Sequence, residues 1–157
     1  MAIAYLSIGS NVGDKLYNCN EAIRRLQEVE GAEVLARSVL YLTKPAGGPR
    51  QEDYLNGVLK IETENPPKRL LRDVKAIEND MGRKPAPRNY PRIIDIDILL
   101  YDDLVLKTRE FTIPHPRMHE RKFILKGFNE IAPEEVHPVT GKTVGRMYEG
   151  LIRTAAS

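Results

Sequence analysis

The sequence predicts a mixed α+β domain in which strands and helices follow one another in a regular order. Three observations support this prediction: continuous apolar runs, apolar residues repeated at helical spacing, and turn-forming residues at the boundaries between them. The chain has 157 residues, which is enough for one ordinary hydrophobic core. We therefore expect a single domain over residues 1–157, without an internal repeat or a linker.

The first half of the chain is predicted to supply a strand, a helix and two further strands. Residues 3–8 form a continuous apolar run, which is typical of a central strand covered on both faces. A helix follows and ends near Gly31. Its apolar face is predicted to consist of Leu16, Cys19, Ile23 and Leu26. Residues 34–43 and 54–63 then form two consecutive strands.

The second half is predicted to complete the same plan. A second helix begins near Pro66 and ends at Gly82, and a strand follows over residues 94–100. A short hairpin strand, a helix over residues 122–131 and a last helix capped by Thr143 come after it. The order strand, helix, strand, strand, helix, strand is that of a ferredoxin-like βαββαβ sandwich. In this chain, the predicted sandwich has additional C-terminal helices and a hairpin strand.

Composition and charge exclude several classes of protein. The net charge of +2 is too small to indicate a nucleic-acid-binding protein, and no apolar run is long enough to span a membrane. The single Cys19 excludes an internal disulfide and fits a reducing compartment. The chain opens directly on a strand-like run, so we expect no signal or transit peptide. The expectation is a cytoplasmic monomer.

The strand within residues 91–100 carries the strongest functional signal. The pattern has Ile94, Ile96, Ile98 and Leu100 on one face and Asp95, Asp97 and Leu99 on the other, which is the period-two pattern of a half-buried strand. Side chains two residues apart lie ~6.5–7 Å apart on one face of a strand, so the two carboxylates can share ligands. A strand that points two carboxylates at one place must either solvate them or bind a cation.

A basic loop with four cationic residues and three prolines precedes this strand. Its members are Arg83, Lys84, Pro85, Pro87, Arg88, Pro91 and Arg92. The prolines lack backbone donors, so the loop cannot join a sheet centrally, and we expect it to move in the absence of a ligand. The acid pair and the loop together suggest a polyphosphate that contacts metal on one side and Arg on the other. The alternative is an edge strand and a loop that are simply solvated.

Two further segments contain candidate binding residues. Tyr54 and Asn56 share a face of their strand, and an aromatic ring beside a carboxamide suits a flat heterocycle with an amide-like edge. The alternative for Asn56 is a hairpin turn formed with Gly57. His115 lies in a proline-stiffened segment and can bond a phosphate or ribose, although a lone His is more often structural.

Glu78 and Lys75 lie near the end of the second predicted helix. They can line the floor beneath a nucleotide, or Glu78 can be a solvated surface acid. No cluster of Cys and His indicates zinc, and no Ser-His-Asp set is evident from spacing.

Taken together, the motifs resemble the 6-hydroxymethyl-7,8-dihydropterin pyrophosphokinase family almost end to end. In chain order they are Gly9-Ser10-Asn11, Tyr54-Leu55-Asn56, Gly82-Arg83, Pro91-Arg92-x-x-Asp95-Ile96-Asp97-Ile98, and Pro114-His115 with Arg121 and Phe123. One motif departs from the family, whose members often carry Trp-Gly-Pro-Arg where this chain has Asn89-Tyr90-Pro91-Arg92. The chain has no Trp at all.

The resemblance implies an enzyme of folate biosynthesis. It would transfer the β,γ-diphosphoryl group of ATP to the hydroxymethyl group of 6-hydroxymethyl-7,8-dihydropterin, giving AMP and the pterin diphosphate. By the resemblance, Asp95 and Asp97 hold two Mg²⁺ ions, and the catalytic residues are Arg83, Arg92 and Asp97. The implied ATP contacts are Lys75, Glu78, Arg83, Arg92, Ile98, Thr112, His115 and Arg121. The implied pterin contacts are Thr43, Pro45, Ala46, Tyr54, Asn56 and Phe123.

Two alternatives to this activity remain open from the sequence. Ferredoxin-like domains often only bind ligands, so the chain can be a non-catalytic sensor of a nucleotide or another ligand. A two-metal phosphohydrolase is the other alternative, although such a site would require further carboxylates or His near Asp95 and Asp97. Within the transfer reaction, either metal binding lowers the pKa of the pterin hydroxyl or Asp97 accepts its proton.

Overall fold

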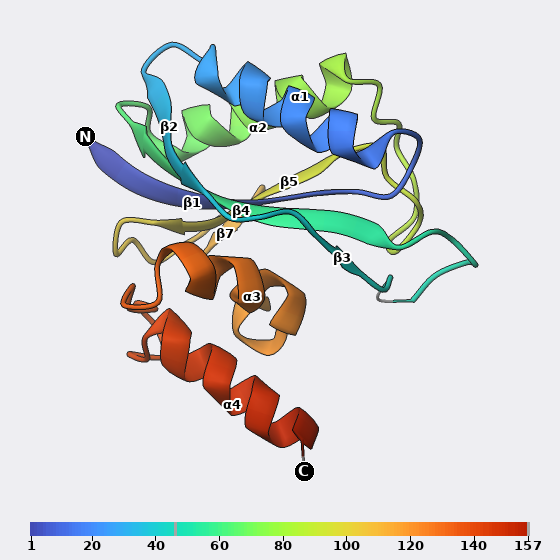
Figure 1. The fold of residues 1–157 in the computed structure, drawn as a ribbon. Coiled ribbons are helices and arrows are strands. Elements are labelled where there is room, and N and C mark those ends of the chain that lie inside the picture. The colour runs from blue at the N-terminus through green and yellow to red at the C-terminus, as the bar shows by residue number, and fades with distance from the viewer. Residues whose placement is uncertain (46, 157) are drawn as a thin grey trace.

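The computed structural model describes residues 1–45 and 47–156, and its centre is a five-stranded sheet (Figure 1). The strands are β1 (Ala2–Ser10), β2 (Ala32–Arg37), β3 (Tyr41–Thr43), β4 (Tyr54–Thr63) and β5 (Asp95–Tyr101). Four of them run in the order β2-β4-β1-β5, β3 pairs with β4, and every pairing is antiparallel. This arrangement confirms the ferredoxin-like α+β sandwich expected from the sequence.

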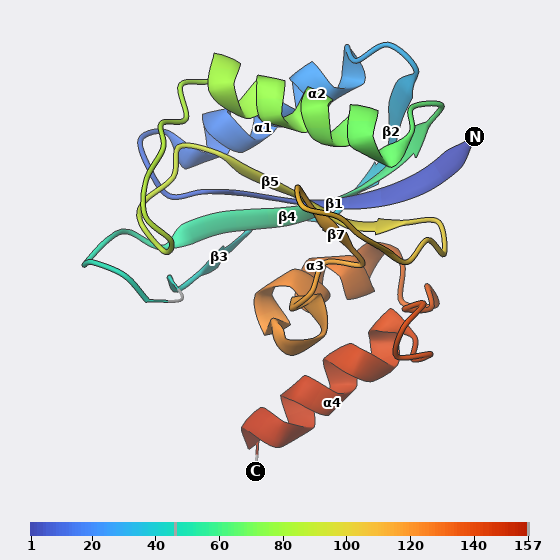
Figure 2. The ribbon, with the colours of Figure 1, turned by 180° about the vertical axis from the view of Figure 1, so that it is seen from behind.

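Helices cover both faces of the sheet (Figures 1 and 2). Helices α1 (Lys15–Gln27) and α2 (Pro67–Asp80) lie on one face, and α3 (Lys122–Ile131) and α4 (Val144–Ala156) lie on the other. A separate hairpin of β6 (Leu106–Lys107) and β7 (Thr112–Ile113) and a 3₁₀ turn at Met118–Glu120 connect β5 to α3. No helix in the described part of the chain is long and apolar enough to cross a membrane.

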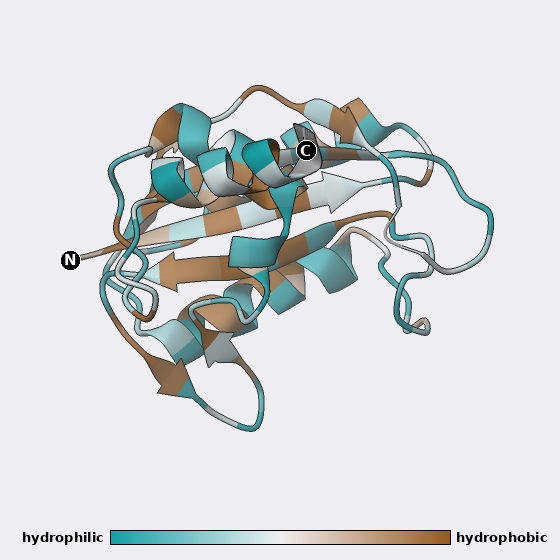
Figure 3. Ribbon diagram, turned by 90° about the horizontal axis from the view of Figure 1, so that it is seen from below, coloured by the Kyte–Doolittle hydropathy of each residue, from teal (hydrophilic) through white to brown (hydrophobic). Residues whose placement is uncertain are grey.

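Two hydrophobic clusters hold these layers together. Leu6 and Ile8 of β1 pack with the buried residues of α1 and α2, whereas Tyr5 packs with α3 and its ring lies 4.6 Å from that of Phe128. Apolar residues accordingly band the strands between the two helical layers (Figure 3). The central strand is therefore covered on both faces, as the continuous apolar run predicts.

The edge strand β5 follows the predicted alternation only as far as Ile98. Ile96 and Ile98 join the cluster beneath α1 and α2, but Leu99 and Leu100 both join the cluster beneath α3. The register shifts here, because Leu6 faces Ile98 and the next residue toward the N-terminus of β1 faces Leu100. The bulge turns Leu100 to the opposite face from the one predicted.

Two other predictions about the elements are wrong. The predicted strand 34–43 is divided between β2 and β3, because the buried Ser38 hydroxyl accepts a hydrogen bond from the Val58 N–H at 2.9 Å. Leu16 is 56% exposed rather than buried. The inward face of α1 is formed by Asn18, Cys19, Ala22, Ile23 and Leu26 instead.

Candidate active site

A pocket lies on the α3 face of the sheet, where the loops after β3 and α2 approach each other. The structure brings ten of the residues predicted for the site into its lining. They are Thr43, Pro45, Tyr54, Asn56, Arg83, Arg92, Asp95, Asp97, Arg121 and Phe123. Residues from three strands, two loops and the start of α3 thus meet at one place.

Five predicted ATP contacts lie outside the lining of this pocket. They are Lys75, Glu78, Ile98, Thr112 and His115. Ile98 is buried in the core beneath α1 and α2, so only its backbone is available to a ligand. Ala46, predicted to contact the pterin, lies outside the described residues. The ligand contacts of these residues stay predictions.

The acid pair and the carboxamide meet across three neighbouring strands. In the register of the sheet, Gly9 of β1 lies between Asn56 of β4 and Asp95 of β5, and Asp97 faces Ser7. A Cβ atom on Gly9 would lie 2.7 Å from the Asn56 side-chain oxygen. The absence of a side chain at Gly9 therefore leaves the floor of the pocket open between the amide and the carboxylates.

The two carboxylates fit a cation. Burial, then the charges of Asp95 and Glu78, raise the pKa of Asp97 to about 7, and Arg83 only partly opposes this rise. Two acids that repel each other on one strand face are stabilised when a metal ion takes their shared charge. In the described residues no group of three or more His, Cys, Asp or Glu is arranged to hold a metal. Asp95 and Asp97 would thus have to hold it with ligands from bound substrate or water.

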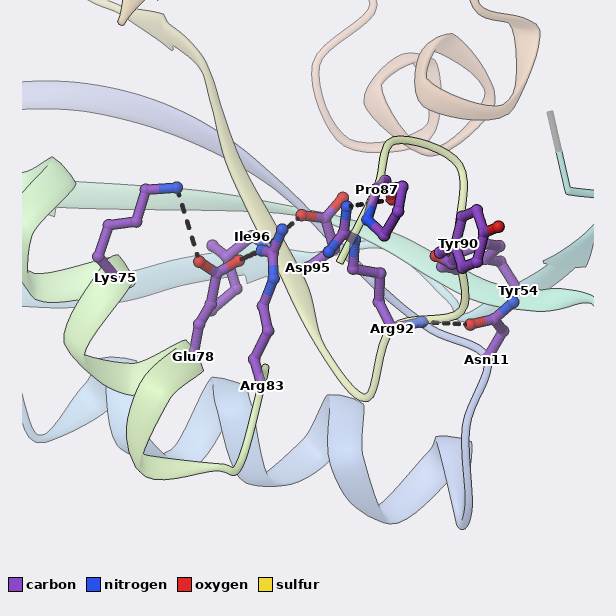
Figure 4. Close-up of polar contacts among 10 residues, drawn as sticks. All are labelled: Asn11, Tyr54, Lys75, Glu78, Arg83, Pro87, Tyr90, Arg92, Asp95 and Ile96. Atoms are coloured by element: carbon purple, nitrogen blue, oxygen red, sulfur yellow. Dashed lines mark hydrogen bonds and ion pairs between the residues drawn. The ribbon is translucent and has the colours of Figure 1, made fainter. Parts of the chain in front are cut away.

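A buried ion pair at the free edge of β5 positions the acid pair (Figure 4). Glu78 of α2 is 2% exposed, forms an ion pair with Arg83 and accepts a hydrogen bond from the Ile96 N–H at 2.8 Å. The same Arg83 nitrogen lies 3.0 Å from Asp95 Oδ1, and Lys75 Nζ lies 3.9 Å from Glu78 Oε1. Arg83 therefore bridges a buried carboxylate and the candidate metal site.

The pKa of Glu78 reflects competing effects. Burial raises it above its ordinary value, while the Ile96 N–H and Arg83 lower it. The surface-acid alternative for Glu78 is wrong because the side chain is buried. Its position four residues after Val74, on the buried face of α2, was the signal in the sequence that marks it as an inward-facing acid.

The aromatic and amide end of the pocket is built on β3, β4 and α3. Asn56 is 8% exposed, lies inside β4 and donates a hydrogen bond to the Thr43 hydroxyl, so the hairpin-turn alternative is wrong. The buried Tyr41 hydroxyl accepts from the Gly127 N–H at 3.0 Å and donates to the Phe123 carbonyl. These bonds fix the first turn of α3, and Phe123 with it, against the sheet.

His115 lies next to β5 and is neutral at pH 7. The backbone N–H of His115 donates to the Leu99 carbonyl at 2.9 Å, and the imidazole Nδ1 accepts from the backbone N–H of Arg117 at 3.2 Å. Burial, followed by the charge of Arg121, lowers the pKa of His115 to about 4. The Nδ1 contact leaves the proton on Nε2, which makes His115 a neutral donor.

Several pocket residues were missed by the sequence analysis. Lys44, Arg88, Asn89 and Tyr90 all line the pocket, and Gly9 forms part of its floor. Lys44 lies between the predicted residues Thr43 and Pro45, and Tyr90 lies two residues before the predicted Arg92, but the directions of both side chains depend on loop conformation. Arg88 was recognised only as part of the basic loop.

Comparisons with known proteins agree with these features. A family model described as 7,8-dihydro-6-hydroxymethylpterin-pyrophosphokinase matches residues 5–133. The 2-amino-4-hydroxy-6-hydroxymethyldihydropteridine pyrophosphokinase of Aquifex aeolicus is 41% identical over 142 residues, which are 90% of this chain and 88% of that protein. The folic acid synthesis protein fol1 of Schizosaccharomyces pombe is 46% identical over 138 residues, which are 88% of this chain but 19% of that protein.

The share of each relative's length that aligns with this chain differs between relatives. It spans about a fifth of the length of the folic acid synthesis proteins that it matches. A crystal structure of Plasmodium falciparum HPPK-DHPS with pteroate aligns with a TM-score of 0.79 at 18% identity, covering 97% of this chain and 42% of that one. This likeness concerns the fold. The family match and the Aquifex relative, with the motifs, show that the chain belongs to the 7,8-dihydro-6-hydroxymethylpterin-pyrophosphokinase family.

Proposed function

We propose that this chain transfers the β,γ-diphosphoryl group of ATP to the hydroxymethyl group of 6-hydroxymethyl-7,8-dihydropterin in folate biosynthesis. The observation that carries the proposal is the row formed by Asn56, Gly9 and Asp95 across three strands. A ring held by Asn56 would place its substituent over the open floor at Gly9, beside the acid pair. Family membership and the names of the relatives support the same activity.

The amide end of the pocket binds the pterin in this proposal. The Asn56 side chain offers both a donor and an acceptor to the amide-like edge of the ring. Tyr54 and Phe123 flank the ring, and Thr43 and Pro45 close the side of the slot. Because Asn56 is held by Thr43, its amide is already oriented before the pterin arrives.

The acid pair and the arginines bind the triphosphate. Asp95 and Asp97 would hold two Mg²⁺ ions, which would supply positive charge to phosphate oxygens and lower the pKa of the pterin hydroxyl. Arg92 and Arg121 line the same pocket and can pair with phosphate oxygens, and the remaining ATP contacts are Lys75, Glu78, Ile98, Thr112 and His115. Glu78 contributes by holding Arg83 beside Asp95.

The transfer is a displacement at the β-phosphorus. The pterin hydroxyl oxygen forms a bond to this phosphorus, and the bond from the β-phosphorus to the oxygen shared with the α-phosphate breaks, so that AMP leaves. Negative charge grows on the leaving α-phosphate, where Arg83 and Arg92 stabilise it more than in the ground state. The hydroxyl proton leaves either directly to water or to the Asp97 carboxylate, which lines the same pocket.

We also propose that the chain works as a single domain and as a monomer in the cytoplasm. The buried free thiol of Cys19 supports a reducing compartment, because nothing in the described residues pairs with it as a disulfide.

The nucleotide product tests the proposed activity. The protein is mixed with ATP and Mg²⁺, with and without 6-hydroxymethyl-7,8-dihydropterin, and the nucleotides are separated by anion-exchange chromatography. We expect AMP only when the pterin is present. ADP as the main product, or phosphate release without the pterin, would contradict the assignment and favour a phosphohydrolase. Binding of ATP without any product would favour the sensor.

A further inference from the structure

One aromatic side chain of the pocket has no role in the proposed reaction so far. Tyr90 is 42% exposed and lines the pocket. The described part of the chain exposes other large apolar side chains, but Tyr90 alone among them faces this pocket. A large exposed aromatic at the mouth of a pocket gains favourable contact when a flat ligand covers it.

The backbone of Tyr90 is held in place by the loop after β3. Asn89, the residue before it, has a positive φ of 65°, and its carbonyl accepts a hydrogen bond from Gln51 Nε2 at 2.8 Å. A Cβ atom on Gly48 would lie 2.0 Å from the same carbonyl oxygen, so only glycine permits this approach of the two loops. The loop that presents Tyr90 is therefore fastened on its outer side.

The inner side of the loop is fastened to the pocket itself (Figure 4). The Tyr54 hydroxyl donates to the Tyr90 carbonyl at 3.3 Å. The Arg92 N–H donates to Asn11 Oδ1 at 2.8 Å, and the Asn11 N–H donates to the Arg92 carbonyl at 3.0 Å. Asn11 also donates to Gln51 Oε1 at 2.8 Å, so both loops and the end of β1 form one connected unit.

The chemistry of the Tyr90 ring indicates which part of the substrates it contacts, since the cations Arg88 and Arg92 on the same loop also line the pocket and are available to phosphate. Arg83 contacts Asp95, whereas the Tyr90 backbone carbonyl accepts a hydrogen bond from the Tyr54 hydroxyl. An uncharged ring that lines the same pocket as Tyr54 and Phe123 is suited to a flat heterocycle and not to a phosphate.

We infer that Tyr90 is a third aromatic contact of the bound pterin, beside Tyr54 and Phe123, and that it contributes to selection of a flat ring. This inference rests on the proposed function and deepens it. Tyr90 occupies the segment in which family members often carry Trp-Gly, and because this chain has no Trp, Tyr90 is the aromatic residue of that segment here.

Steady-state kinetics with two variants at Tyr90 test the inference. Tyr90→Leu removes the ring, and the KM for the pterin should rise about 3- to 10-fold, the range for loss of one aromatic contact. The Kd for ATP and Mg²⁺ without pterin should stay within about twofold, since no phosphate contact is lost. Tyr90→Phe keeps the ring and should bind the pterin several-fold more tightly than Tyr90→Leu. Tyr17→Leu, at an exposed tyrosine on α1 outside the pocket, is the matched control.

A binding measurement separates this inference from the proposed activity. Because the chain has no Trp, Tyr90→Trp and Tyr17→Trp each contain one indole. With α,β-methylene ATP and Mg²⁺ present, addition of the pterin should shift the emission maximum of Tyr90→Trp to shorter wavelength and leave that of Tyr17→Trp in place. Equal responses of the two variants, or a pterin KM of Tyr90→Leu equal to that of the wild type, would overturn the role of Tyr90. If the wild type itself makes no AMP, the proposed function fails instead.

Discussion

The two halves of the pocket are built in different ways. Asp95, Asp97 and Asn56 stand on paired strands, where the register of the sheet fixes their directions. Tyr90 and Arg92 stand on a loop whose backbone is held by side chains from elsewhere in the chain. Ladder hydrogen bonds repeat along each pair of strands, whereas the loop is held by single bonds, from Tyr54 to the Tyr90 carbonyl and from the Arg92 N–H to Asn11. The directions of the side chains in the strand half thus follow from the strand period, whereas the position of the loop half depends on individual contacts.

The halves also differ in charge. The strand half holds Asp97, whose pKa is raised first by burial and then by the charges of Asp95 and Glu78. The loop half contributes cations, of which Arg83 already contacts Asp95. In the proposed reaction, the strand half would position the reacting groups, and the loop half would supply compensating charge and cover the bound ring. This division can be tested by comparing equivalent substitutions in the two halves.

The largest expected effect is on the acid pair. Asp95→Ala or Asp97→Ala should lower kcat by at least about a thousandfold, because several kcal/mol of metal-dependent stabilisation are lost. Removal of one of two like charges should leave the melting temperature unchanged or higher. Asp103→Ala, at an exposed acid in the turn after β5, is the control and should have the activity of the wild type. Variants that keep most of their activity at an unchanged melting temperature would make the pair an ordinary solvated strand face.

The second effect is on the ion pair behind the strand. Glu78→Leu should lower the free energy of unfolding by about 2–3 kcal/mol, because Arg83 and the Ile96 N–H lose their buried partner. Glu78→Gln keeps an acceptor for the Ile96 N–H, so its free energy of unfolding should fall by a smaller amount. Urea denaturation measures both. An equal and small loss in the two variants would show that Glu78 does not hold the edge of β5.

Some of the features behind these predictions can be predicted from the sequence, and others cannot. The period-two pattern predicted the direction of Asp95 and Asp97, because strand geometry alone decides it. The same pattern failed at Leu100, since a bulge depends on how β1 and β5 pair, and that pairing is not visible in either strand alone. The contacts of Tyr90 depend on Gln51 and Asn11, which are distant in sequence, and local patterns carry no signal for them.

A smaller effect is expected for the amide of the strand half. Asn56→Ala should weaken pterin binding by about 1–3 kcal/mol, because the polar edge of the ring loses its partner. ATP affinity without pterin should barely change. Isothermal titration calorimetry measures both ligands, and Asn20→Ala on the exposed side of α1 is the control. The loss should exceed that of Tyr90→Leu; equal losses for pterin and ATP would give Asn56 a structural role instead.

The smallest effect concerns the pH dependence of stability. Burial lowers the pKa of His115 to about 4, whereas an unfolded His has an ordinary pKa near 6.5. As the pH falls below 6.5 the unfolded chain takes up this proton first, so the stabilising contribution is full above pH 6.5 and declines toward pH 4. His115→Gln should flatten this decline in urea denaturation at pH 7.5 and 5.0. An NMR titration of His115 with an ordinary midpoint near 6.5 would contradict the expectation.

The position of attack on ATP can be tested directly by following its β-phosphorus. ATP labelled with ³²P at the β-phosphate is incubated with the protein, Mg²⁺ and 6-hydroxymethyl-7,8-dihydropterin, and the products are separated. If the hydroxymethyl oxygen attacks the β-phosphorus above Asp95 and Asp97, the label appears in the pterin product and the AMP is unlabelled. Label that stays with the nucleotide, as ADP, would mean that attack occurs at the γ-phosphorus and would contradict the account.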